Sequence, residues 1–296
     1  MVETKSMGDR VFSLCNGLFL TLLAIIFVYP LIYILSISFS GTMAVLNREV
    51  FLWPVDFSLE AYKTVFESEA IGRAYLNTIY YTIVGTVFEL IGTTLLAYPL
   101  SKKRLLGRRT FSFLFYFTNI FNGGMIPTYL VVKNVGFVNS IWSLVIPGCI
   151  SVYYAIILRT NFENVPQELE EAAKIDGMGN WRILLTIYIP LSKAIYAALT
   201  LFFAIGFWNA YMQPLIYLND TAKYPLQIVL RNIVISGSLN DLSNSAVGSG
   251  AFTDMRTIGE TMKSAAIIVV MVPVMCIYPF VQKYFVKGVM IGAVKG

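Results

Sequence analysis

Long apolar blocks separated by shorter polar segments make up most of this chain. The first block runs from Val11 to Phe39. It is far longer than the apolar core of a secretory signal, and no small-residue cleavage site follows it. Because a helix needs about 20 apolar residues to cross a bilayer, we interpret this block as a retained membrane span behind a polar tail, residues 1–10.

Similar blocks recur along the chain and predict an all-α integral membrane protein with six transmembrane helices. The expected spans are 11–40, 74–101, 110–132, 140–158, 191–218 and 264–286. They form one transmembrane domain, residues 11–286, followed by a tail at 287–296. Composition agrees, because 57% of the residues are hydrophobic and only 13% are charged, about half the charged fraction of a soluble domain.

The orientation follows from where the basic residues lie. Segment 102–109 is strongly basic and segment 159–190 is basic or amphipathic. If both face the cytoplasm, residues 110–158 must cross the membrane twice, although Asn122-Gly123-Gly124 interrupts the first crossing. The proposed inner segments hold 14 of the 22 lysines and arginines, so both termini are predicted to be cytoplasmic.

Several kinds of chemistry are excluded by composition. The chain has no histidine, and its three cysteines fall in separate apolar blocks without metal-ligand spacing. No Gly-x-x-x-x-Gly-Lys-Ser/Thr phosphate loop occurs. We therefore expect no catalytic residues, no metal site and no bound cofactor. The net charge of +5 reflects the inner segments and does not indicate a nucleic acid partner.

Two long segments are expected on the outer face. Residues 41–73 contain a helix-like stretch, Leu59–Phe66, which predicts a small ordered cap. Residues 219–262 contain a Ser/Asn/Gly-rich part, 236–250, which predicts a flexible segment. A passive linker is an equally good interpretation of that part.

A polar segment between the fourth and fifth spans has the pattern of a short helix. Pro166 suits a helix start, acidic residues follow in the first turns, and Gly177 suits the end. Leu169, Ala172 and Ala173 are expected on one face, where small side chains would let a partner come close. Composition alone equally allows a helix lying on the inner leaflet, which would suit Trp181.

The residue intervals in this segment favour the docking interpretation. Glu171-Ala172-Ala173 is followed after three residues by Gly177, and after nine more by Ile187-x-Ile189-Pro190. This pattern closely resembles the EAA loop of binding-protein-dependent ABC importer permeases, with isoleucine in place of leucine before the proline. That exchange conserves volume.

The resemblance extends over nearly the whole chain. It includes Asn122–Tyr129 and the ending Gly292–Gly296, which look like the carbohydrate-importer branch. The chain looks most like oligo- and polysaccharide importer permeases and is similar to the second maltose-permease subunit. The resemblance implies a type I importer fold in a bacterial cytoplasmic membrane.

The resemblance also implies partners. They are a second permease subunit, two cytoplasmic ATPase subunits that use ATP and Mg²⁺, an extracytoplasmic solute-binding protein, membrane lipid and a carbohydrate substrate. The EAA loop, residues 159–190, would dock into the ATPase. The residues expected to take part are Glu170, Glu171, Ala172, Ala173, Asp176, Gly177, Ile187 and Pro190, with Glu171 forming the ion pair.

Candidate substrate contacts lie in the second and fifth spans. Aromatic rings suit the CH faces of sugars and amides suit their hydroxyls, which favours Trp208, Asn209, Tyr211 and Gln213. An interfacial aromatic belt is the alternative. Glu89 lies mid-span, where an ionisable group either lines a cavity or makes an interhelical contact.

Ser238, Asn240 and Asn244, in the expected flexible segment, are candidate contacts to the binding protein by resemblance to the maltose system. The competing function is a secondary transporter driven by an ion gradient. It would need facing intramembrane acids or repeated broken helices, whereas Glu89 is the only acid well inside an expected span. An intramembrane enzyme is disfavoured by the absence of histidine and of paired acids within spans.

Overall fold

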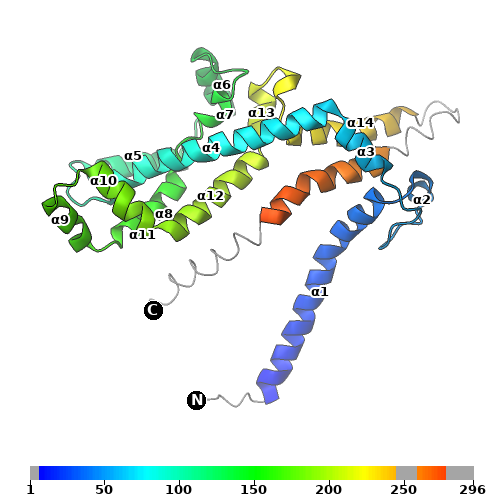
Figure 1. Cartoon of the computed structure of the whole chain (residues 1–296), viewed down its shortest axis with the longest axis horizontal. Helices are drawn as coiled ribbons and strands as arrows, with labels where there is room; N and C mark the ends of the chain where they lie inside the picture. The colour runs from blue at the N-terminus through cyan, green and yellow to red at the C-terminus, as the bar shows by residue number, and fades with distance from the viewer. Residues whose placement is uncertain (1–6, 245–258, 278–296) are drawn as a thin grey trace. The chain divides into compact units, whose positions relative to one another are not determined.

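The computed structural model describes residues 7–244 and 259–277, and every regular element in these ranges is helical. Figure 1 shows the helices along the chain, coloured from blue to red. The chain divides into two compact units. The first contains residues 1–69 and 230–272, and the second contains residues 70–229 and 273–296.

In the first unit, the long helix α1 (Met7–Ser38) is followed by the short helices α2 (Thr42–Leu46) and α3 (Glu60–Glu67). Helix α3 confirms the helix expected over 59–66. A small core of Ile37, Ala44 and Val50 joins the end of α1 to α2. Most side chains of α1 are exposed, as a helix surrounded by lipid or by another subunit would require.

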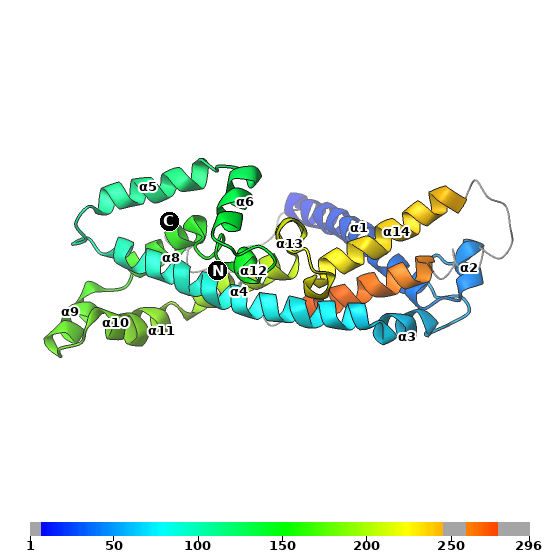
Figure 2. The same ribbon diagram turned by 90° about the horizontal axis from the view of Figure 1, so that it is seen from above.

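The second unit is built around α4 (Glu69–Ser101), a helix of 33 residues. The elements that follow it are α5 (Arg108–Ile120), α6 (Met125–Asn134), α7 (Trp142–Val145), α8 (Val152–Glu163), α9 (Gln167–Ile175), α10 (Asn180–Ile183), a π-helical turn (Leu184–Tyr188), α11 (Ile189–Leu191), α12 (Lys193–Trp208), α13 (Met212–Tyr217) and α14 (Leu226–Asn244). Helices α9, α10 and α11 lie at the C-terminal end of α4 in both Figure 1 and Figure 2.

Three helices among the described residues are long and apolar enough to span a membrane: α1, α4 and Gly259–Ile277. A fourth span results if Asn180–Leu191 and Lys193–Trp208 count together, although they are bent by 86°. The described residues therefore do not give six uninterrupted spanning helices. The part of the sixth expected span after Ile277 lies outside the described residues.

The expected third, fourth and fifth spans are each broken, for local reasons. The third breaks before Gly124, whose φ of +87° suits glycine. The fourth breaks around Pro147-Gly148, where proline removes a helical hydrogen bond. The fifth breaks at Asn209–Tyr211, between α12 and α13. Such breaks are tolerated at membrane depth where the backbone is buried in protein or lines a cavity.

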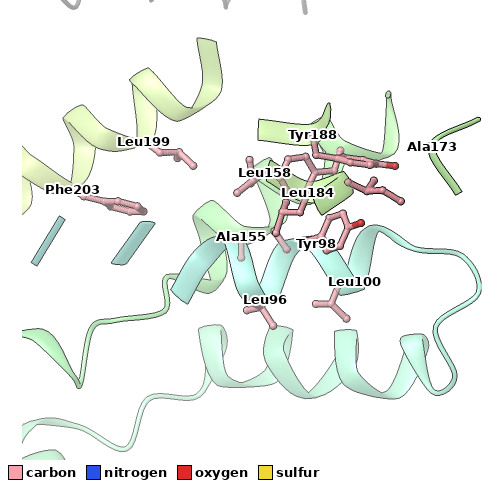
Figure 3. Packing of buried hydrophobic residues seen from close by; sticks show 13 residues of the cluster. Leu96, Tyr98, Leu100, Ala155, Leu158, Ala173, Leu184, Tyr188, Leu199 and Phe203 are labelled. Carbon is pink, nitrogen blue, oxygen red and sulfur yellow. The ribbon is translucent and has the colours of Figure 1, made fainter. Parts of the chain in front are cut away.

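The main core of the second unit joins the C-terminal half of α4 to α8, α10 and α12 (Figure 3). Leu158 and Ile183 are fully buried in it. Gly92 permits close approach nearby, because a Cβ there would lie 2.1 Å from the carbonyl oxygen of Cys149. The core therefore fixes the elements that carry the polar segment to the end of α4.

One expectation about flexibility is wrong for the residues that can be described. Helix α14 runs from Leu226 to Asn244, so the first part of the expected flexible segment 236–250 is helical. The apolar residues from Leu226 to Ile235 begin this helix, which continues past Ser238 and Asn240 to Asn244. Residues 245–250 lie outside the described residues.

Candidate functional site

Helix α9 begins and ends as its sequence predicts. Pro166 precedes its first residue, and Glu168 and Glu170 lie in the first turn, where negative charge is favourable. Gly177 adopts a left-handed φ of +76°. The amide of Met178 then donates to the carbonyl oxygen of Ala173 at 2.9 Å, a return that closes the helix end.

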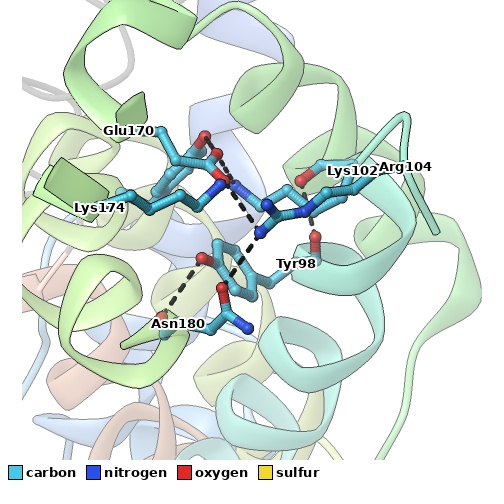
Figure 4. A network of polar contacts seen from close by, with 8 residues as sticks. Tyr98, Lys102, Arg104, Glu170, Lys174 and Asn180 are labelled. Atoms are coloured by element: carbon cyan, nitrogen blue, oxygen red, sulfur yellow. Dashed lines mark hydrogen bonds and ion pairs between the residues drawn. The ribbon is translucent and has the colours of Figure 1, made fainter. Parts of the chain in front are cut away.

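The Glu170 carboxylate is turned into the protein and is only 7% exposed. Its Oε2 lies 2.6 Å from Nζ of Lys102 and accepts a hydrogen bond from the Tyr188 hydroxyl at 2.7 Å. Its Oε1 pairs with Lys174 and lies 3.4 Å from Nη2 of Arg104. Figure 4 shows Glu170 and Lys174 of α9 meeting Lys102 and Arg104 of the loop after α4, whereas Tyr188 belongs to the π-helical turn. This cluster of five residues is called the Glu170 cluster.

Lys102 is held in the cluster by aromatic rings as well as by charge. Its Nζ lies 3.7 Å from the ring centroid of Tyr188 and 4.3 Å from that of Tyr98. Both distances are within the range of cation–π attraction. Burial lowers the pKa of the Lys102 ammonium, and the nearby Glu170 opposes that shift.

The electrostatics of the cluster favour a charged Glu170. Burial alone would raise the pKa of this carboxyl, but hydrogen bonds from Lys102, Lys174 and Tyr188 outweigh burial and hold the pKa at about 2. A carboxylate with several donors is stabilised in its charged form. Glu170 is therefore ionised at neutral pH and joins α9 to the loop after α4.

A second ion-pair group secures the same loop to α8. Glu163 pairs with Arg108 and, at 2.9 Å, with Nε of Arg159. Arg108 also donates from Nε to the carbonyl oxygen of Leu100 at 2.7 Å. From its own sequence, segment 102–109 indicates only the orientation of the chain and not this role. The sequence feature that indicates this role is the complementary charge of the basic segment 102–109 and the acidic residues in segment 163–171.

The opposite face of α9 is exposed. Glu171 and Ala172 lie at the surface, and Leu169 and Ile175 are 44% and 87% exposed. Glu171 forms no ion pair with any residue that the structure describes. Trp181 in α10 is also exposed, at 67%. This face, Leu169, Glu171, Ala172, Ile175 and Trp181, is called the outward face.

The expected docking face is corrected in one respect. Ala173 is only 4% exposed and packs in the unit's own core, so it is not available at the exposed surface where Leu169 and Ala172 lie. A helix turns by about 100° per residue, so Glu170 and Ala173 are buried whereas their neighbours Glu171 and Ala172 are exposed. Asp176 and Pro190 are exposed, and Ile187 packs against the core.

The candidate substrate contacts separate into two groups. Glu89 and Gln213 both line a cavity of about 350 Å³. Trp208 is buried beside Tyr75, with ring centroids 5.8 Å apart, and does not line this cavity. Asn209 accepts a hydrogen bond from Gln227 at 3.3 Å.

Comparison with known proteins identifies the family to which this chain belongs. Residues 4–291 match the family described as "Binding-protein-dependent transport system inner membrane component". The chain belongs to this family. It is therefore a membrane component of a transport system and not an enzyme. The family's dependence on a binding protein argues against the alternative of a secondary transporter driven by an ion gradient.

Relatives of this permease share most of its length. The polygalacturonan/rhamnogalacturonan transport system permease protein YtcP of Bacillus subtilis is 42% identical over 98% of this chain and 100% of its own. Protein LplC of the same organism is 41% identical over 100% and 98%. A crystal structure of a bacterial ABC transporter involved in the import of the acidic polysaccharide alginate matches with a TM-score of 0.86 and 36% identity. It covers 95% of this chain and 98% of that chain.

Proposed function

We propose that this permease is the membrane-spanning subunit of an ATP-driven, binding-protein-dependent importer of carbohydrate, with oligo- or polysaccharides as substrates. Family membership supports the transport role. The names of the relatives support the substrate class, since they include a polygalacturonan/rhamnogalacturonan permease and an alginate importer. The single observation that carries the mechanism is the division of α9 into a buried ionic face and an exposed face.

In this proposal α9 is the coupling helix. Its outward face docks into a cytoplasmic ATPase subunit, with Glu171 as the ion-pairing residue and Ala172 allowing close approach. The Glu170 cluster fastens the helix to the loop after α4, so that a displacement of α9 reaches the long helix instead of bending a free loop. A short, capped helix that is packed on one face against the protein can transmit force in this way, because packed elements are nearly incompressible.

The remaining parts of the transporter follow from the same proposal. The partners are a second permease subunit, two ATPase subunits that bind ATP and Mg²⁺, and a solute-binding protein on the outer side. The permease itself has six spans, some of them broken, and both termini face the cytoplasm of a bacterium. Its loop 159–190 is then cytoplasmic, as the distribution of basic residues supports.

The test is uptake by the complete transporter in proteoliposomes with its binding protein inside or outside the vesicle. ATP-dependent, vanadate-sensitive import of an oligosaccharide is expected, together with ATPase activity that rises when loaded binding protein is added. Import that continues without ATP and collapses with an ionophore would contradict the proposal. Absence of carbohydrate import with active ATPase would contradict the substrate class alone.

A further inference from the structure

The N-terminal part of α4 is fastened to a short turn that lies 142 to 147 positions further along the chain. The side-chain amide of Asn77 donates from Nδ2 to the carbonyl oxygen of Ala222 at 2.8 Å and to that of Tyr224 at 3.1 Å. The hydroxyl of Tyr81, one helical turn further along α4, donates to the carbonyl oxygen of Lys223 at 2.9 Å. Two side chains of α4 therefore hold three consecutive carbonyl groups of this turn.

The turn at residues 218–225, called the outer turn, joins α13 to α14 and contains a single 3₁₀ turn, Thr221–Lys223. It lies almost entirely in the segment 219–262 that the sequence predicts on the outer face. Thr78 of α4 caps the helix that follows, because its hydroxyl accepts a hydrogen bond at 2.8 Å from the amide of Leu226, the first residue of α14. That amide has no partner within its own helix. Thr78 is only 1% exposed, so this contact is shielded from water.

Asn139, between α6 and α7, holds the outer turn from another element. Its side-chain oxygen Oδ1 accepts hydrogen bonds from the backbone amides of Asn219 and Asp220, both at 3.2 Å. Its carbonyl oxygen accepts from Nζ of Lys223 at 2.8 Å. Asn139 adopts a left-handed φ of +62°, which asparagine tolerates better than most residues. The outer turn is therefore bound to two elements, mostly through its own main chain.

The opposite end of α4 is fastened as well. Lys102, directly after the helix, lies 2.6 Å from the carboxylate of Glu170 in α9. Between the two attachments α4 is one continuous helix, and the distance along it from Asn77 to Ser101 is about 36 Å at 1.5 Å per residue. Because packed elements are nearly incompressible, a displacement at one end of this helix reaches the other end. A movement of the outer turn is thereby conveyed to α9.

We propose that Asn77 is a positioning residue that makes the outer turn move with α4, so that a binding protein docking on the outer side acts on α9 through this helix. The inference rests on the proposed function, which puts the end of α4 near Asn77 on the outer side and Lys102 on the cytoplasmic side. It goes beyond that function by assigning the path of the signal to one helix and its outer attachment to one amide. Loss of this amide disconnects the two ends of the transporter and leaves the ATPase itself intact.

The test measures ATP hydrolysis by the complete transporter in proteoliposomes, without binding protein and with a saturating amount of it. The binding protein is loaded with oligogalacturonate of one defined length, a fragment of the glycan named for the relative YtcP. The measured quantity is the stimulation, the ratio of the two rates. Because both rates come from the same vesicles, the ratio does not depend on the amount of active transporter.

Asn77→Leu removes both donors and keeps a side chain of similar size. The stimulation should fall by about fivefold or more, since one net hydrogen bond contributes a factor of roughly five to an equilibrium, while the rate without binding protein stays unchanged. Tyr81→Phe removes one donor, keeps the ring and should lower the stimulation by about twofold to threefold. The control is Gln227→Leu, which removes an amide close to the outer turn whose hydrogen bond goes to Asn209 at 3.3 Å and not to α4. It should keep the wild-type stimulation.

The two attachments of α4 provide a second measurement. Glu170→Gln weakens the inner attachment, and Asn77→Leu weakens the outer one. If α4 carries the signal, the attachments act in series, so the double variant should be stimulated about as weakly as the more impaired single variant. Losses that multiply would show two separate effects and would overturn the inference.

The outcomes separate this inference from the proposed function. Wild-type stimulation in Asn77→Leu overturns the inference and leaves the proposed function standing. An equal fall of the rates with and without binding protein would show that the amide only supports the fold, which also overturns it. Where Asn77→Leu lowers the yield of assembled transporter, Tyr81→Phe is judged by the same two criteria. A wild-type transporter whose ATP hydrolysis does not respond to loaded binding protein contradicts the proposed function itself.

Discussion

The Nζ of Lys102 lies 2.6 Å from Oε2 of Glu170, and the two side chains are only 12% and 10% exposed. This ion pair joins the residue directly after α4 to α9, 68 positions further along the chain. It is enclosed by the rings of Tyr98 and Tyr188. Helix α9 is therefore attached to a spanning helix by a buried polar contact, in addition to its two backbone connections.

Replacing Glu170 by Gln should destabilise the permease by roughly 3 kcal/mol, because Lys102 would be left as a buried charge without its partner. The measurement is the thermal unfolding midpoint of the purified permease in detergent. ATPase stimulation by loaded binding protein should fall in the same variant, since α9 is no longer fastened to α4.

The matched control for Glu170 is Glu67→Gln. Glu67 pairs with Lys63 at 3.9 Å on an exposed surface, where the side chains are 68% and 74% exposed. Exposed pairs of this kind contribute little to stability, so no measurable change is expected. Equal behaviour of Glu170→Gln and Glu67→Gln would contradict the importance of the buried pair.

The Glu170 cluster also predicts a pH dependence. The pKa of Glu170 is about 2 in the folded protein, against an ordinary value of 4.5. A depressed carboxyl pKa contributes stability that is present above the unfolded value and is lost as the pH falls toward the folded value. The unfolding midpoint of the wild-type permease should therefore drop between about pH 4.5 and pH 2. The drop should be smaller in Glu170→Gln, and identical profiles would refute the assignment.

Glu171→Lys should leave the permease folded and uncouple it. Glu171 is exposed and has no ion pair among the described residues, so its replacement removes no internal contact. The new charge would oppose a basic group on the ATPase. We expect an unchanged unfolding midpoint, with a loss of uptake of at least about tenfold from one reversed interface pair. Normal uptake by this variant would show that Glu171 is not the docking residue.

Local features of the coupling helix could be predicted from sequence, whereas its orientation could not. Pro166 and Gly177 act on their own neighbours in the chain, and both bound the helix as expected. Glu170 and Glu171 are chemically identical neighbours. Which of them turns inward depends on Lys102 and Tyr188, and only the folded chain brings these together.

The spanning helices could also be predicted from sequence only in part. Apolar content predicted long apolar helices, and α1 and α4 match two expected spans closely. It did not predict the break around Pro147-Gly148, although both residue types disfavour helices. A prediction based on apolar content alone counts Pro147 and Gly148 toward the span. It ignores whether the backbone at these residues can continue a helix.

Gly177→Val should weaken the coupling helix because of backbone strain alone. Gly177 has a φ of +76° and no atom within 4 Å of the position that a Cβ would take, so there is no steric clash with a neighbour. A β-branched residue in this conformation costs about 1–2 kcal/mol. Gly177→Asn should restore most of the stability, since asparagine tolerates left-handed backbone.

Gly179 provides the control for Gly177. It also has no atom within 4 Å of a Cβ position, but its φ is −75°. Gly179→Val should therefore leave the unfolding midpoint and the stimulated ATPase rate close to those of the wild type. If the two valine variants lost activity equally, bulk at the docking surface, and not backbone conformation, would be the cause.

Gly92→Ala should disrupt the contact that places α8 and the coupling helix beside α4. A Cβ at this position would lie 2.1 Å from the carbonyl oxygen of Cys149, and a backbone atom cannot move aside as a flexible side chain can. Overpacking of this kind typically costs about 1–3 kcal/mol. Gly72→Ala is the matched control on the same helix, because nothing lies within 4 Å of its Cβ position and alanine is the better helix former. We expect a lower unfolding midpoint and weaker ATPase stimulation for Gly92→Ala only. A Gly92→Ala permease as stable and as well coupled as Gly72→Ala would show that the spacing between α4 and α8 does not position the coupling helix.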